Sequence, residues 1–387
     1  MSKGKMRKST CVLLGICFLS SCGGREPHVD KITEEGVEVV VNHLQPYELK
    51  GEASHLKLEE ETRIDFERDE YSDLGLKEPD IVEVDSRGNI FIVEKFTASD
   101  YFIYKFSRDG RFIMKFGRKG QGPGEVQGVW DLLPDKNDRI LVSDPNVNKV
   151  VEFDTEGRFV KETRVGPGLR EVLPLPNGNY LARRSRKADA DPYGMYLCIF
   201  NPDFEEVKTV GFYDMSDLVP GKRQSGIIVP FYWRVAGDRI YIGNGGREYD
   251  IRVYDLDGNL LYKMRKEFNP VAYPEEFRLQ TEKIAAARPN LNLFVPKDMP
   301  PFNSFFVDEA GRLFVMTYER SQSAAGYIHD VFNADGILIA RVGLGDYGIM
   351  GRALNHLRAT ARNGRFYRLR FKESGYPELI VYRMTWD

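Results

Sequence analysis

The residue types that build most catalytic centres are sparse in this sequence. It has five histidines, and three of them, His28, His43 and His55, lie close to the N-terminus. A zinc centre built on imidazole needs about three ligands that converge on one point. His329 and His356 are too few for such a centre unless carboxylates complete the set. Neither a G-x-S-x-G nor an H-E-x-x-H motif occurs, so the sequence favours binding over catalysis.

Cys22 offers a different kind of chemistry. Residues 1–21 hold a basic start, an apolar run from Cys11 to Leu19, and two serines directly before Cys22. The run is too short to cross a bilayer as a helix, so it indicates an export signal. It resembles a bacterial lipoprotein signal, which implies cleavage before Cys22 and a diacylglycerol on its thiol. We therefore expect a protein of the cell envelope, lipid-anchored at the outer membrane; an ordinary secretory signal is the alternative.

Loss of this signal changes both the cysteine count and the charge. Cys11 and Cys17 leave with it, so Cys198 would be the one free thiol of the mature chain, with no partner for a disulfide. The formal net charge of −3 becomes −7, with 51 basic against 58 acidic residues. Proteins that bind nucleic acids usually carry a basic face. We therefore expect no nucleic-acid partner.

Two groups of side chains are candidates for contact with a ligand. Arg184 and Arg186 precede two aspartates on one predicted loop. Their guanidinium groups would either receive a carboxylate or sulfate, or pair with those aspartates. The second group consists of Tyr232, Tyr249, Tyr318 and Arg320. A tyrosine combines a large apolar ring with a polar tip that suits a wet interface, so we expect these rings at the surface, against sugars or peptide side chains.

A repeated unit positions these residues. The chain has 387 residues, 42% of them hydrophobic, whereas a single core rarely grows beyond about 250–300 residues. Residues 81–117 and 130–164 each read as four short strands with polar turns between them. Gly110 and Gly157 occupy the same position in the two units, 47 residues apart. A tight hairpin requires a positive φ at that position. The chain is therefore expected to be a modular array of repeats.

Looser copies of the unit follow, and the last one is incomplete. They lie at 173–210, 233–264, 305–342 and 358–384. The sixth unit lacks a fourth strand, and a closed ring would remove the exposed sheet edges, so we expect residues 62–66 to supply that strand. Residues 351–372 hold seven basic and no acidic side chains, while 59–73 hold eight acidic ones against two arginines. Opposite charges on neighbouring strands favour this pairing; an anionic ligand on the basic stretch is the alternative.

Six four-stranded units predict an all-β fold, a six-bladed β-propeller. The stretch FGRKGQGPGEV at 116–126 and the strands that follow it are similar to an NHL-type repeat. Together with the lipoprotein signal, they make the chain resemble the six-bladed propeller lipoproteins of Gram-negative gut bacteria. That resemblance implies the fold and no particular activity. The predicted organisation is a signal peptide (1–21), a tether and N-terminal segment with an extra strand (22–58), and the propeller (59–387).

We expect the site on one face of the ring. The long connections lie between the second and third strands of a blade or between blades, and in a propeller both kinds reach the same face. Loops on a rigid scaffold are where binding residues gather. The longest insertion contains a predicted helix at 274–289. It would be either a lid over the channel or a strut that covers a blade edge with Phe277 and Ile284.

These observations predict a binding module whose loop face takes a glycan, a peptide or an envelope protein. The alternative is a metal-dependent hydrolase, lactonase or lyase with its site in the central channel. Fold relatives of the lactonase type imply a calcium ion held by oxygen ligands, and Asp131, Asn244 and Asp308 are candidates by repeat position. A third hypothesis is a structural subunit of an envelope complex.

Overall fold

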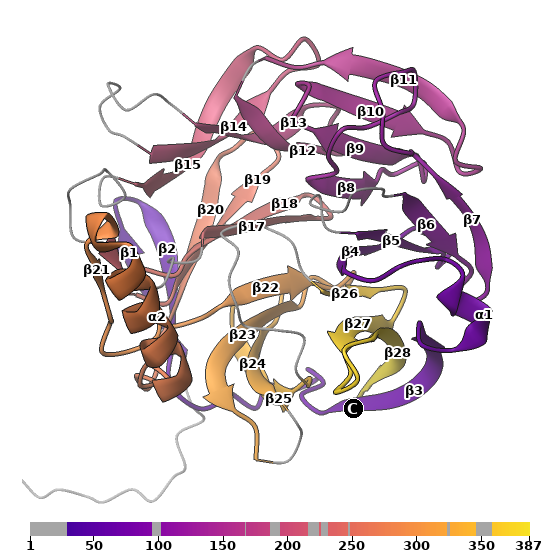
Figure 1. Ribbon diagram of the computed structural model, residues 1–387. Helices are drawn as coiled ribbons and strands as arrows, with labels where there is room; N and C mark the ends of the chain where they lie inside the picture. Colours follow the sequence, from indigo (N-terminus) through magenta and orange to yellow (C-terminus); the bar gives the residue numbers. More distant parts are fainter. Residues whose placement is uncertain are drawn as a thin grey trace, which may run out of the picture.

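The computed structural model describes residues 29–94, 102–166, 168–185, 194–215, 224–225, 231–246, 248–322, 326–345 and 358–387. Within these ranges, six antiparallel sheets are arranged around one axis as a closed ring (Figure 1). In every blade the first strand lies nearest the axis and the strands follow one another outward. The prediction of an all-β, six-bladed propeller with four-stranded blades is confirmed.

The first three blades are continuous in sequence. Blade 1 contains β4 (Pro79–Val84), β5 (Ile90–Glu94), β6 (Ile103–Phe106) and β7 (Phe112–Phe116). Blade 2 contains β8 (Asp131–Pro134), β9 (Ile140–Asp144), β10 (Lys149–Phe153) and β11 (Phe159–Arg164). Blade 3 contains β12 (Leu169–Pro174), β13 (Tyr180–Ser185), β14 (Gly194–Phe200) and β15 (Glu206–Asp214). The buried thiol of Cys198 lies in blade 3 and is free.

Two of the last three blades, 4 and 6, include strands from the N-terminal end of the chain. Blade 4 contains β17 (Phe231–Ala236), β18 (Arg239–Asn244), β19 (Asp250–Asp255) and β20 (Leu260–Lys266). Blade 5 contains β22 (Ser304–Val307), β23 (Leu313–Arg320), β24 (Tyr327–Phe332) and β25 (Leu338–Gly343). Blade 6 contains β26 (Ala359–Arg362), β27 (Arg365–Phe371), β28 (Pro377–Trp386) and, from the N-terminal side, β3 (Leu56–Asp65).

A recurring side-chain turn explains why the repeat is visible in the sequence. Asp154 accepts hydrogen bonds from the backbone N–H groups of Glu156 (3.0 Å) and Arg158 (2.9 Å), and Gly157 adopts a φ of 71°. The same pattern recurs at Asp85, Asp135, Asn201, Asp255 and Asn333. Asp and Asn favour such turns because their short side chains bond to the backbone two residues on.

Strand β3 closes the ring, as predicted. It pairs antiparallel with β28, and Ile64 lies opposite Leu379. Ion pairs join the acidic strand to the basic blade: Asp65 with Lys372 (2.7 Å), Glu61 with Arg365 (2.6 Å) and Glu59 with Arg383 (2.7 Å). The two stretches of opposite charge are therefore the two sides of the closure.

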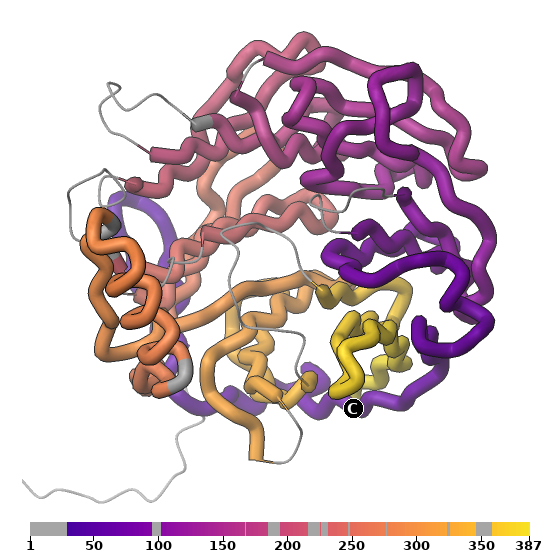
Figure 2. Tube along the Cα trace, in the orientation of Figure 1, coloured from indigo at the N-terminus to yellow at the C-terminus, as the bar shows by residue number. Residues whose placement is uncertain are grey.

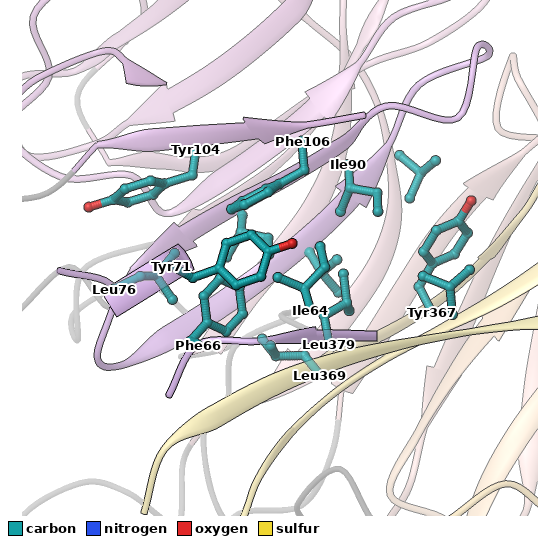
Figure 3. Close-up of a cluster of buried hydrophobic side chains, with 14 residues drawn as sticks. Ile64, Phe66, Tyr71, Leu76, Ile90, Tyr104, Phe106, Tyr367, Leu369 and Leu379 are labelled. Carbon is teal, nitrogen blue, oxygen red and sulfur yellow. The ribbon is translucent and has the colours of Figure 1, made fainter. Parts of the chain in front are cut away.

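Small apolar clusters between neighbouring blades form the core. Figure 3 shows the cluster between blades 6 and 1, where Ile64 and Phe66 pack with Phe106 and Leu379. The rings of Phe66 and Phe106 meet edge to face, with centroids 5.9 Å apart. Because Ile64 is fully buried there, the hydrophobic effect stabilises the closed ring directly.

The segment before β3 wraps around the outside of the ring. β1 (Asp30–Glu34) and β2 (Val37–Asn42) form a hairpin, and β2 pairs parallel with β20, which extends blade 4 to six strands. From there the segment runs past blade 5 to blade 6 (Figure 2). The sequence indicated one extra strand in this segment and no partner for it.

The described helical segments are α1 (Asp69–Ser72), α2 (Glu275–Ala287) and the 3-10 turn η2 (Pro289–Leu291). α2 matches the helix predicted in the longest insertion. It lies at the rim of the ring beside β21 (Leu293–Phe294), which pairs with β16 (Gln224–Ser225) (Figure 1). A rim position does not fit a lid over the channel, and Ile284 is 41% exposed, so the predicted packing of Ile284 in a strut is wrong. No helix in the described ranges is long and apolar enough to span a bilayer.

Candidate functional site

A cavity of about 600 Å³ occupies the axis of the ring. The inner strands of all six blades contribute to its wall. One lining residue from each is Glu83 (β4), Pro134 (β8), Pro174 (β12), Arg234 (β17), Val307 (β22) and Thr360 (β26). The cavity therefore exists only in the closed ring, because no single blade could form it.

The cavity opens among the short hairpins that join first and second strands. Its rim includes the turn residues Lys136, Gly237, Glu309 and Asn363. These turns lie on the face opposite the long connections, where we expected the site. The cavity formed by the described residues is thus at the other end of the channel from the predicted loop face.

Glu83 and Arg234 place opposite charges on the cavity wall. The carboxylate of Glu83 accepts a hydrogen bond from the N–H of Val84. Burial raises the pKa of Glu83 to about 7, although the guanidinium groups of Arg234 and Arg362 oppose that rise. Arg234 donates from Nη1 to the carbonyl oxygen of Trp233 (2.7 Å). A carboxyl group with a pKa near neutrality that faces a cavity is a typical feature of a functional site.

Two further carboxyl groups interact with Arg234. Burial raises the pKa of Asp131 well above its usual range, the charges of Glu171 and Glu83 raise it further, and Arg234 opposes them. Glu171 is fully buried and accepts hydrogen bonds from Nε (3.2 Å) and Nη2 (2.9 Å) of Arg183. The site therefore couples carboxyl groups from β4, β8 and β12 to one guanidinium group from β17.

Glu171 has an unusual backbone conformation. Its φ is 51°, in the left-handed region, where the register between β12 and β13 shifts. Residues other than glycine rarely adopt this conformation, and such positions cluster at functional sites. At Glu171 this rare backbone conformation coincides with a buried carboxylate beside the channel.

The charged groups between blades 2 and 3, at the mouth of the cavity, neutralise one another. Arg139 pairs with Asp135 (2.8 Å) and with Glu152 (3.0 Å), and Lys161 also pairs with Glu152 (3.0 Å). Tyr180 lines the same part of the cavity and stacks on Phe204. The mouth thus presents balanced charge and a fixed aromatic ring.

The three tyrosines predicted to be exposed are buried. Tyr232, Tyr249 and Tyr318 are 9%, 2% and 5% exposed. Tyr249 packs on Phe302 and Phe332 between blades 4 and 5 and donates its hydroxyl to Asp330 (3.1 Å). The Tyr318 hydroxyl accepts a hydrogen bond from Asn303 (3.2 Å), and the Tyr232 ring meets the edge of Phe305. All three rings are buried, Tyr232 and Tyr249 in the cluster between blades 4 and 5, so the prediction that they are exposed for surface contacts is wrong.

The predicted basic residues do not form one site. Arg184 lies in strand β13, and its guanidinium group pairs with Glu206 of β15. Arg320 is exposed at the end of β23 and lies over the ring of Tyr327, 4.1 Å from its centroid. Arg186 and Cys22 lie outside the described residues. Arg184 is therefore paired across the sheet, and the aspartates that follow it in sequence, like Arg186, lie outside the described residues.

The structure does not bring the three predicted calcium ligands together. Asp131 begins an inner strand and exposed Asn244 ends β18, at the loop face, whereas Asp308 follows β22 at the hairpin face. Asp308 accepts hydrogen bonds from the backbone N–H (2.8 Å) and Nη1 (3.2 Å) of Arg312, as a turn residue does. In the described part of the chain, no three His, Cys, Asp or Glu side chains are placed to hold a metal ion.

Sequence reasoning missed Glu83, Glu171 and Arg234. A signal for two of them was present, because Glu83 interrupts the apolar run Ile-Val-Glu-Val and Arg234 interrupts Phe-Tyr-Trp-Arg-Val. A charge inside an inner strand is costly to bury, so it points to a paired group or to a channel wall. Glu171 gave no such signal.

Comparisons with known proteins agree with this fold. A protein-family model described as a 6-bladed β-propeller matches residues 71–279. A search of curated proteins finds no match. A solved structure from Bacteroides fragilis, described as an exported protein, is 13% identical, covers 90% of this chain and 99% of its own, and has a TM-score of 0.54.

Two further solved structures mark the range of similarity. A member of another protein family, from Bacteroides vulgatus, is 11% identical, covers 87% of this chain and 99% of its own, and has a TM-score of 0.52. A gluconolactonase from Xanthomonas campestris is 12% identical, covers 79% of this chain and 88% of its own, and has a TM-score of 0.38. At these identities the likeness concerns the fold alone.

Proposed function

This chain belongs to the family of six-bladed β-propellers whose model it matches, and from that premise we propose that it is a binding module that holds a small polar ligand in its channel. The observation that carries the proposal is the cavity of about 600 Å³ with Glu83 and Arg234 on its wall. Ligand sites usually have volumes of about 300–1,000 Å³ and polar groups that orient the ligand. The volume of this cavity lies within that range, and its charged side chains suit a small polar molecule or the end of a glycan or peptide.

A variant that fills the cavity tests the proposal. Ala236 lines the cavity on β17, so Ala236→Trp should abolish binding of any ligand found by screening sugars, short glycans and short peptides with thermal shift and calorimetry. Asp238→Trp is the matched control, because Asp238 points into solvent two residues further along. A ligand that binds Ala236→Trp as well as it binds the parent protein would place the site elsewhere and overturn the proposal.

We also propose that the protein is exported and lipid-anchored through Cys22 in the cell envelope, at the outer membrane. The signal-like residues 1–21 support this proposal, as does the shared fold of a Bacteroides fragilis protein described as exported. Cys22→Ser should move the protein from the membrane fraction to the soluble fraction of expressing cells. Continued membrane association of this variant would argue against a lipid anchor.

A further inference from the structure

The inner strands place three carboxyl groups beside the channel. Glu83, Asp131 and Glu171 lie on three neighbouring blades, and Arg234 interacts electrostatically with all three. Glu171 already has its own cation, because Arg183 holds it through two hydrogen bonds. Arg234 is therefore shared between Glu83 and Asp131. Arg362, the other guanidinium group that acts on Glu83, also pairs with Glu309 at the mouth of the cavity (3.8 Å).

Resting on the proposed function, we infer that the ligand carries an ammonium group and that this group binds the carboxylate of Glu83 on the cavity wall. Glu83 lines the cavity directly. Arg234 is less suited to capture an anion, because carboxyl groups already surround it and its Nη1 donates to Trp233. A bound ammonium group would pair with Glu83, whose two guanidinium neighbours are each shared with another carboxyl group.

The protonation of the channel supports this inference. The groups that face Glu83 are Arg234 from β17, Arg362 from β26 and Asp131 from β8, with Glu171 from β12 acting on Asp131. With these neighbours the pKa of Glu83 is about 7, so a proton neutralises this carboxyl group in much of the free protein at neutral pH. A bound cation neutralises the Glu83 carboxylate in place of this proton, and the proton is released to solvent.

The shape of the site favours an organic cation. No trio of His, Cys, Asp and Glu side chains in the described ranges is placed to hold a metal ion. The cavity is far larger than one ion needs, and Leu133, Pro134, Pro174 and Phe306 give it apolar walls. An amine with a carbon skeleton would place its charge at Glu83 and its apolar part against these side chains.

Matched amines and alcohols test the inference. Benzylamine with benzyl alcohol, and putrescine with butanediol, differ in whether an amino or a hydroxyl group is present, and calorimetry on the full propeller measures each affinity. We expect each amine to bind at least about tenfold more tightly than its alcohol at pH 8. Alkyl amines keep their proton at this pH, so amine affinity should fall about tenfold between pH 8 and pH 6 as Glu83 takes up its proton.

Proton release and two variants make the test specific. At pH 6 the binding heat should depend on the ionisation enthalpy of the buffer, because close to one proton leaves per amine bound. Glu83→Gln should remove the preference for amines and the pH dependence. Glu156→Gln removes an exposed charge away from the cavity and should leave both unchanged.

The possible outcomes distinguish failure of this inference from failure of the proposed function. Equal affinity for amine and alcohol, or amine binding that survives Glu83→Gln, overturns the inference. Absence of amine binding overturns it as well. If neutral ligands from the wider screen still bind and are blocked by Ala236→Trp, the channel function stands and only the ammonium preference has failed.

Discussion

At the scale of single residues, charged side chains inside apolar inner strands mark the channel. Glu83 and Arg234 each interrupt a run of core residues, and both lie on the cavity wall. Burial of an incompletely balanced carboxylate lowers the stability of the folded protein. The free energy of unfolding should therefore depend on the protonation of Glu83.

Glu83→Gln should stabilise the protein at alkaline pH. The pKa of Glu83 is about 7 in the folded protein and near 4.5 when unfolded, so between these values the folded state holds more protons. Stability contributed by this group is present below about pH 4.5 and is lost as pH rises to about 7. A glutamine at position 83 does not titrate, so the free energy of unfolding of the Glu83→Gln variant should exceed that of the parent by about 3 kcal/mol at pH 8 and by little at pH 4.

Urea unfolding of parent and variant between pH 4 and pH 8 measures this difference, with Glu156→Gln as the control for an exposed carboxylate. A constant difference across the range would show that Glu83 titrates normally.

At the scale of elements, one buried side chain, Asn42, ties the N-terminal hairpin to blade 5 in addition to its pairing with β20. Asn42 is fully buried; its Nδ2 donates to the carbonyl oxygens of Gly336 (2.9 Å) and Arg265 (3.2 Å), and its Oδ1 accepts from the N–H of Leu338 (2.8 Å). The hairpin on blade 4 is thus joined to a turn of blade 5. Nothing local in sequence indicates these partners, because they lie more than 200 residues away.

Asn42→Ala should cost about 2–3 kcal/mol of stability, because it leaves buried backbone groups without their partners. Differential scanning calorimetry measures the loss as a lower melting temperature. Glu38→Ala on the same strand is the control, since Glu38 pairs with Lys31 at the surface and such pairs contribute little. A melting temperature of Asn42→Ala equal to that of the control would show that the hairpin is not anchored through Asn42.

At the scale of the whole molecule, closure makes both the fold and the cavity. β3 completes blade 6, and Ile64 lies in the cluster between blades 6 and 1 (Figure 3). The cavity needs inner strands from all six blades. An open ring would therefore lose its ligand site together with its cooperativity.

Two truncations test the closure. A chain that begins at residue 56 keeps β3 and should still unfold cooperatively, at a lower temperature because it lacks the hairpin at blade 4. A chain that begins at residue 67 lacks β3, exposes the edge of β28 and the cluster around Leu379, and should show no cooperative transition by calorimetry or near-ultraviolet circular dichroism. Indistinguishable melting curves for the two chains would contradict the closure by β3.

The repeat, the number of blades and the closing strand follow from local patterns. Glycine and aspartate turns recur at a fixed phase, and the complementary charges of residues 59–73 and 351–372 lie within short stretches. Such patterns depend on neighbours in the chain, which is why the closure by β3 could be predicted. The predicted signal and anchor rest on the same kind of local pattern.

Tertiary packing decided where the tyrosines and the cavity lie. It buried Tyr232, Tyr249 and Tyr318, and the sequence did not reveal this because an aromatic ring near a strand end suits a surface or an interior gap equally well. It also placed the cavity at the hairpin end and assembled its charged groups from blades distant in sequence. The environment of Glu83 depends on Arg234 and Arg362 from blades 4 and 6, and closure of the ring brings those groups within electrostatic reach.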